Sequence, residues 1–291
     1  MKKFRKLVLV IVISVLALNA VYYMILFSFD NPYIDRFYEK VSDSHNGSII
    51  VGTSRARYAI NEDYLDEQFK FKNLSFTVDI SPYDSSYLKY IKDITSYKTK
   101  NKDRIAIVTI DPYALSIDND TSNDYFFEYN KNDYKHFNWK YLIKNRLTPI
   151  KITEEQINKQ MRILFYGDVD NRKINERNIQ VYIDNYHKPQ INEIALNNLI
   201  ELITYLKLFS KVYLIRTPIT KQFYTSENQY SPNFTMLMDS ISKKYEINYY
   251  DLNLKTIQSK LEFYDIHHMN SKSSILFTKY IDSLLKRNTN Q

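Results

Sequence analysis

Hydrophobic residues after position 45 follow two spacings, one that favours buried strands and one that favours the helices covering them. Strand-length runs rich in apolar and β-branched residues occur at 48–52, 71–76, 104–110, 212–215 and 247–251. Apolar residues at helical spacing occur at 83–94, 191–208, 236–245 and 271–285. Strands that alternate with amphipathic helices predict an α/β fold, doubly wound around a mostly parallel sheet.

Two of these helices begin with recognisable start signals. Ser81 followed by Pro82 supplies an N-cap residue and a proline at the first helical position. Ser271 stands before the apolar face of the last helix, and we interpret it as that helix's N-cap.

The stretch from Asp118 to Pro189 breaks the alternation. It is rich in Asn and Asp, contains the single tryptophan, Trp139, and shows no clear strand. A segment of this length exceeds ordinary loops, so we predict a helical insertion near the face of the domain that would carry an active site. A lid that selects the substrate and structural padding both remain open as its role.

The first thirty residues form a segment distinct from the predicted α/β domain. Lys2, Lys3, Arg5 and Lys6 precede an apolar run from Leu7 to Phe29 that only Ser14, Asn19 and Ser28 interrupt. At about 1.5 Å per residue this run is long enough for a bilayer core of roughly 30 Å. It predicts an uncleaved signal-anchor with residues 1–6 in the cytoplasm, a span at 7–29, a connector at 30–46 and an extracytoplasmic domain at 47–291.

Charge and cysteine content exclude several functional and structural classes for that domain. Without its four N-terminal cations the chain has 36 basic and 33 acidic residues, a net charge of +3. This excess is too small and too scattered to predict nucleic-acid binding. Since the chain has no cysteine, neither a disulfide framework nor a lipid-modified cysteine can hold it. The 27 tyrosines favour half-buried packing positions over a carbohydrate-stacking surface.

A candidate nucleophile follows the first predicted strand. Gly52 ends the run 48–52, and Ser54 comes two residues later. The carboxyl end of a strand in an open α/β sheet is where such folds place their reactive groups. Ser54 is therefore the first candidate for a catalytic serine.

A serine hydroxyl needs a base and a group that orients this base. Asp265 and His268, just before the last helix, have a spacing that can supply both. The same spacing recurs at Asp133/His136 and Asp184/His187, so the spacing alone does not decide. The final pair is preferred because a helix start follows it directly.

Around these residues the chain resembles a known family, the SGNH (GDSL-type) hydrolases. Gly52-Thr53-Ser54 is similar to their Gly-Asp-Ser block, and the segment 265–270 is similar to their C-terminal Asp-x-x-His block. The membrane-anchored subgroup found with surface-polysaccharide and teichoic-acid genes is more similar still, at 52–55 with 60–61, at 73–75 through 81–83, and at 110–112. The resemblance implies a flavodoxin-like sheet and a Ser54–His268–Asp265 triad that moves or removes an O-acyl group, with acetyl expected.

The resemblance also implies an oxyanion hole formed by the Ser54 N–H and a donor from the turn at 73–75. Ser75 or a neighbour replaces the usual second-block glycine. Asp111 stands near the place of the third-block Asn, and a carboxylate cannot donate a hydrogen bond. Asn73 and Arg55 are therefore further candidates for the second donor. Arg216, at the end of a strand on the same sheet edge, is a candidate for substrate binding.

Other chemistries fit the sequence less well. Three glycines cannot build a dinucleotide or phosphate loop, so we expect no cofactor. His267 and His268 lack the spacing of a metal motif, and adjacent histidines are expected to point apart, so no metal is assigned. The expected partners are a cell-surface glycan or wall polymer, and a multi-span membrane acyltransferase for which the chain would be an inactive accessory subunit if the triad does not work.

Overall fold

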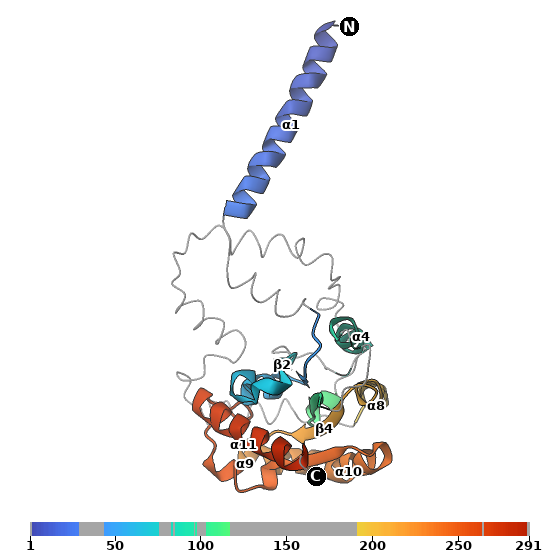
Figure 1. Ribbon diagram of the computed structural model, residues 1–291, viewed down its shortest axis with the longest axis vertical. Coiled ribbons are helices and arrows are strands. Elements are labelled where there is room, and N and C mark those ends of the chain that lie inside the picture. Colours follow the sequence, from blue (N-terminus) through green and yellow to red (C-terminus); the bar gives the residue numbers. More distant parts are fainter. Residues whose placement is uncertain are drawn as a thin grey trace. The chain divides into compact units, whose positions relative to one another are not determined.

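The computed structural model describes residues 2–28, 44–75, 83, 85–95, 97, 103–116, 191–263 and 265–289 (Figure 1). The chain divides into two units, 1–42 with 129–160, and 43–128 with 161–291. The first contains helix α1 (Lys2–Ser28), whose side chains at 2, 7, 20 and 22–28 are not described. Among the described residues, no helix combines the length and the apolarity required to cross a membrane. The predicted insertion, 118–189, and most of the predicted connector lie outside the described residues.

The second unit is built on a five-stranded parallel sheet. Its strands are β1 (Ile49–Val51), β2 (Lys72–Asn73), β3 (Ile105–Thr109), β4 (Lys211–Arg216) and β5 (Asn248–Asp251), in the order β2-β1-β3-β4-β5. The predicted α/β class and all five predicted strand positions are confirmed. Because β2 and β3 flank β1 on opposite sides, the carboxyl ends of β1 and β3 form the switch point where such sheets bind ligands.

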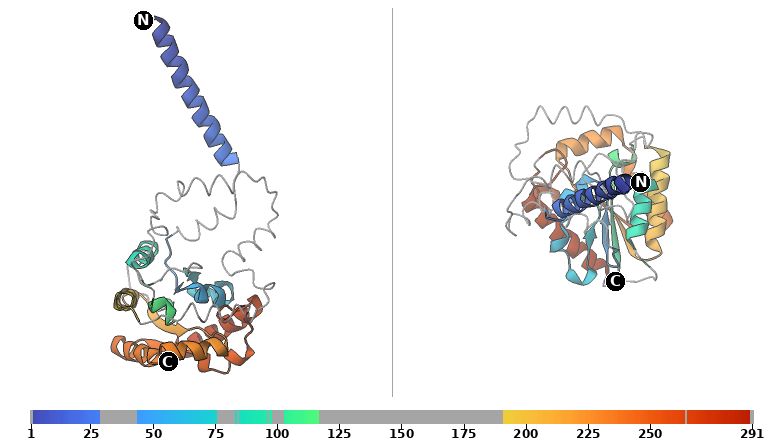
Figure 2. Two further views of the ribbon diagram at one scale, coloured as in Figure 1. Left: turned by 180° about the vertical axis from the view of Figure 1, so that it is seen from behind. Right: turned by 90° about the horizontal axis from the view of Figure 1, so that it is seen from above.

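Helices cover both faces of this sheet. They are α3 (Ser54–Ala59), α4 (Ser85–Ile94), α8 (Glu193–Lys207), α9 (Lys221–Tyr230), α10 (Phe234–Tyr245) and α11 (Ser271–Thr289). Short 3₁₀ turns lie at Glu62–Tyr64, Glu67–Phe69, Tyr113–Leu115, Leu252–Leu254 and Gln258–Lys260. The right view of Figure 2 shows α4 and α8 together on one side of the sheet and α11 on the other. Helical spacing in the sequence predicted α4, α8, α10 and α11, but neither α3 nor α9.

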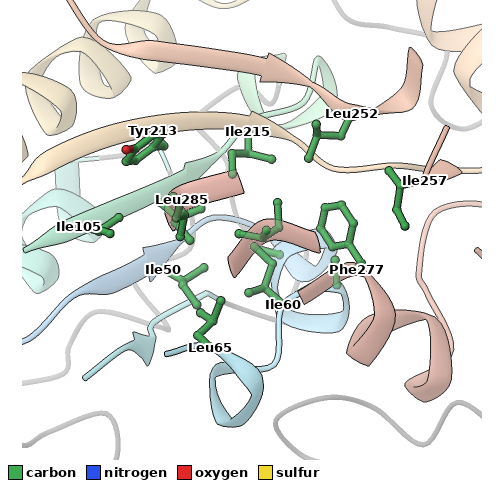
Figure 3. Close-up of a cluster of buried hydrophobic side chains, with 14 of the residues drawn as sticks. Ile50, Ile60, Leu65, Ile105, Tyr213, Ile215, Leu252, Ile257, Phe277 and Leu285 are labelled. Atoms are coloured by element: carbon green, nitrogen blue, oxygen red, sulfur yellow. The ribbon is translucent and has the colours of Figure 1, made fainter. Parts of the chain in front are cut away.

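One hydrophobic core joins the C-terminal helix to strands β1, β3 and β4. Ile50, Ile107 and Ile215 belong to this core, together with Phe277 and Ile281 of α11. Figure 3 shows the core between strands and helices, with Phe277 near Ile60, the residue that follows α3. Each large apolar side chain buried in this way contributes roughly 1.5–3 kcal/mol. The first turn of α11 consequently lies beside α3, where the Ser274 hydroxyl donates to the Ala59 carbonyl across 215 positions of the sequence.

The N-cap of α11 differs from the prediction. Ser271 is the first helical residue, and the side chain of Asn270 accepts a hydrogen bond from the Ser273 N–H at 2.8 Å. Asn270 is therefore the cap, and the assignment of Ser271 was wrong by one position. Asn is as good a capping residue as Ser, so the sequence pattern did not distinguish these neighbours. Ser81 and Pro82 lie outside the described residues.

Candidate active site

The turn after β1 requires glycine. Gly52 has a φ of +152°, and a Cβ added to it would lie 1.8 Å from the Thr109 side-chain oxygen on the neighbouring strand. Only a residue without a side chain allows this conformation and this approach. Thr53 then caps α3, since its hydroxyl accepts a hydrogen bond from the Arg55 N–H at 3.3 Å. Ser54 is thus the first residue of α3, at the carboxyl end of β1.

The Ser54 hydroxyl lies in a hydrogen-bonded row with His268 and Asp265. Ser54 Oγ is 2.8 Å from His268 Nε2, and His268 Nδ1 is 2.7 Å from Asp265 Oδ2. A carboxylate can only accept, so Nδ1 carries the proton and Nε2 is free to accept from the serine. The structure therefore brings the three predicted residues together in the order that nucleophilic acyl transfer requires.

Asp265 is held in its charged form. Burial disfavours the carboxylate, but the hydrogen bond from the His268 ring and the backbone hydrogen bonds outweigh it and hold the pKa of Asp265 well below its usual range. Its other oxygen accepts the backbone N–H groups of His267 and His268, at 2.9 and 2.7 Å. Asp265 therefore shapes the loop that carries the imidazole as well as orienting the ring.

The two adjacent histidines do not point apart, contrary to the expectation from their spacing. Their ring centroids are 3.9 Å apart, and Tyr58, one turn after Ser54 on α3, packs on the His268 ring with centroids 4.4 Å apart. Burial lowers the pKa of His267 well below its usual value, so this ring is neutral. Asp265, His267 and His268 offer ligand atoms within 4.8 Å of one another. However, both ring nitrogens of His268 are already engaged, which speaks against a metal there.

The predicted oxyanion residues differ in availability. The described residues include no hydrogen-bond acceptor for the Ser54 N–H, which is consistent with its predicted role as a donor. The Ser75 N–H donates to the Asn73 side-chain oxygen at 3.0 Å, and the Asn73 amide donates to the Ile60 carbonyl at 2.8 Å. The donors of Asn73 and Ser75 therefore hold the turn after β2 together.

Arg55 and Arg216 are both buried in one charged network. Arg55 Nη2 lies 2.5 Å from Glu227 Oε1, and Arg216 Nη2 lies 2.8 Å from Glu227 Oε2. Arg216 also pairs with Asp251 at 3.1 Å, at the end of β5. Burial opposes the charge of Glu227, but the two guanidinium groups lower its pKa below the usual value. Both predicted arginines are thus paired with buried carboxylates of the protein itself.

Asp111 has a local structural role. Its carboxylate accepts from the Thr53 hydroxyl at 3.2 Å and from the Ala114 N–H at 2.9 Å, and it lies 3.9 Å from Arg55 Nε. It joins the end of β3 to the N-terminus of α3. The competing pairs Asp133/His136 and Asp184/His187 lie outside the described residues.

Glu227 of α9 and Thr220, the N-cap of α9, contact the residues around the site but were not predicted from the sequence. The one available signal was Arg216 itself, because an arginine that ends a buried strand needs a carboxylate partner. Comparison with protein-family models and with curated proteins finds no match to this chain. The geometry around Ser54 is therefore the ground for assigning a function.

Proposed function

We propose that this protein is an SGNH-type serine esterase or O-acyltransferase, anchored in the membrane and acting outside the cytoplasm on a cell-surface polysaccharide. The observation that carries the proposal is the row Ser54–His268–Asp265, with 2.8 and 2.7 Å between the paired atoms. Its place at the switch point of a parallel sheet supports the same conclusion.

The mechanism follows from the protonation states. Ser54 Oγ attacks the ester carbonyl carbon while its proton moves to His268 Nε2, and Asp265 stabilises the resulting imidazolium. The tetrahedral intermediate then collapses, the C–O bond to the sugar breaks, and His268 returns the proton to the leaving alkoxide. Water then attacks the acyl-serine and regenerates Ser54, giving hydrolysis, or another sugar hydroxyl attacks it, giving transfer. His268 activates either acceptor in the same way.

The Ser54 N–H is the first donor to the oxyanion. The second donor would come from the turn at 73–75, where the Ser75 N–H would have to exchange Asn73 for the substrate oxygen. The glycan substrate and the acetyl group rest on the resemblance to the membrane-anchored SGNH subgroup. The anchor rests on the cations and the apolar run that precede the domain.

A second function is favoured by one observation. Since the Ser75 N–H donates to Asn73, only the Ser54 N–H of the two predicted backbone donors has no acceptor among the described residues, and one missing donor costs about 10²–10³-fold in rate. An SGNH-fold subunit that binds glycan, or assists a multi-span membrane acyltransferase without turnover of its own, would fit this arrangement. Reactivity of Ser54 separates the two functions.

The test is labelling of the full chain with a serine-reactive fluorophosphonate, together with hydrolysis of a small acetyl ester. We expect Ser54→Ala to abolish labelling and His268→Ala to lower turnover by about 10³-fold or more. Asp265→Asn should cost less but remain strongly impaired, and the losses should not add, since the three groups act as a unit.

His136→Ala and His187→Ala are the matched controls, because both histidines share the Asp-x-x-His spacing. They should retain labelling and turnover. Folded wild-type protein that neither labels nor hydrolyses the ester would favour the accessory function instead. Loss of activity in a folded control variant, with activity kept in His268→Ala, would contradict the assignment of the base.

A further inference from the structure

We propose that α9 is a brace that sets the distance between the nucleophile and its base, with Glu227 as the positioning residue for Ser54 and Thr220 as the positioning residue for His268. This inference rests on the proposed function, because it describes how the same site is held. The two residues lie one before and one within α9, so a single short helix contacts both halves of the site.

The contact with the nucleophile runs through Arg55, the residue after Ser54. Both oxygens of Glu227 are engaged, one by Arg55 and one by Arg216 at the end of β4. All three side chains are at least nine-tenths buried, with Arg216 fully inaccessible. Charged hydrogen bonds in such surroundings are short and directional, so they hold the first turn of α3 against the edge of the sheet.

The contact with the base runs through the carbonyl of Ile266, between Asp265 and His268. The Thr220 N–H donates to this carbonyl at 3.0 Å and the Thr220 hydroxyl donates to it at 2.8 Å. The same hydroxyl caps α9 by accepting from the Phe223 N–H at 3.4 Å. One side chain therefore joins the N-terminus of α9 to the loop that carries the imidazole.

Phe223 fills the space between the two contacts. Its ring lies 5.3 Å from the Arg55 guanidinium carbon and 5.7 Å from the ring of His267, which in turn contacts His268. Arg55, Phe223 and His267 therefore form a packed row on the side of the site where α9 lies. Through this row, a displacement of α9 would move both sides of the Ser54–His268 hydrogen bond.

This bond joins residues 214 positions apart, carried by different segments. Local structure alone cannot set its length. A misplacement of about 1 Å at reacting groups can lower a rate on the order of 100-fold, even when the cause is remote. The brace is accordingly expected to govern turnover more than substrate affinity.

The experiment compares Glu227→Gln and Thr220→Val in the full chain, purified in detergent. The first variant removes the charge and keeps the shape, and the second removes the hydroxyl and keeps the N–H. Glu201→Gln, in an exposed pair with Lys92, and Thr225→Val, on the exposed face of α9, are the matched controls. Turnover of a small acetyl ester is measured per folded molecule, and hydrogen exchange is followed by mass spectrometry.

Both variants should lose kcat by about tenfold or more, with KM changed less than about twofold. Exchange should rise at 54–59 in Glu227→Gln and at 265–268 in Thr220→Val, while β3 and β4 stay protected. Thr220→Ser, which retains the hydroxyl, should recover most of the turnover. The controls should match the wild type in every readout.

Unchanged exchange at both segments in the two variants would overturn the brace, as would activity lost only in proportion to unfolded protein. Wild-type protein without turnover or probe labelling would overturn the proposed function. In that case the exchange comparison alone still decides whether α9 braces the two segments.

Discussion

At the scale of single residues, Asp265 makes hydrogen bonds beyond the one that orients the imidazole. It accepts from the His268 ring and from two backbone N–H groups, and these bonds hold its pKa below the ordinary value of 3.8. The folded chain therefore binds this proton less tightly than the unfolded chain does. The charged carboxylate stabilises the fold above about pH 4, and this contribution is lost as the pH falls toward the lowered pKa.

We accordingly expect the free energy of unfolding to decrease more steeply in wild-type protein than in Asp265→Asn between about pH 4 and about pH 2.5. Urea unfolding at a series of pH values measures both slopes. Glu227, whose pKa is lowered in the same direction, leaves a residual slope in the variant. Parallel slopes in the two proteins would show that Asp265 is not held in its charged form by these contacts.

At the scale of elements, the start of α11 decides where the imidazole lies. Asn270 caps this helix through Ser273, and its own N–H donates to the Glu262 carbonyl at 3.1 Å. His268 is two residues before this cap. The hydrophobic face of α11 and the polar contacts of its first turn thus position the base together.

Asn270→Ala should lower the free energy of unfolding by about 1 kcal/mol, because an N–H of the first turn loses its acceptor. Ser271→Ala is the control, since Ser271 is already helical and alanine is the better helix former. Thermal or urea unfolding of both variants measures the difference. A larger loss in Ser271→Ala than in Asn270→Ala would return the capping role to Ser271.

At the scale of the whole molecule, the N-terminal segment predicts on which side of the membrane the sheet domain lies. Four cations precede the apolar run and none directly follows it, which favours a cytoplasmic N-terminus and an extracytoplasmic domain. Such an orientation would give Ser54 access to surface glycans. The anchor is a proposal from this sequence pattern.

We expect the protein to sediment with membranes after cell lysis, and protease added outside the cell to digest everything beyond about residue 30. Immunoblotting with an epitope tag at the C-terminus measures both. Extraction by alkaline carbonate would indicate peripheral attachment, and a soluble product starting near Ala20 would indicate a cleaved signal peptide.

The sequence by itself determined the five strands and four of the six helices described in the domain. Their signals are local, since a continuous apolar run or a helical spacing is visible without knowing any neighbour. The choice of Ser54, Asp265 and His268 was local in the same sense. A strand end selected the serine, and a helix start selected one Asp-x-x-His pair among three.

Only the tertiary structure decided how the remaining polar residues are paired. Side-chain chemistry alone made four residues candidates for donation to the oxyanion or for substrate binding, namely Asn73, Ser75, Arg55 and Arg216. Their actual partners are set by packing. Arg55 meets Glu227 across 172 positions, and α9 has too few apolar residues for its helical period to stand out in the sequence. A buried charge must find a partner wherever the fold brings one, so its role is settled only when the chain has folded.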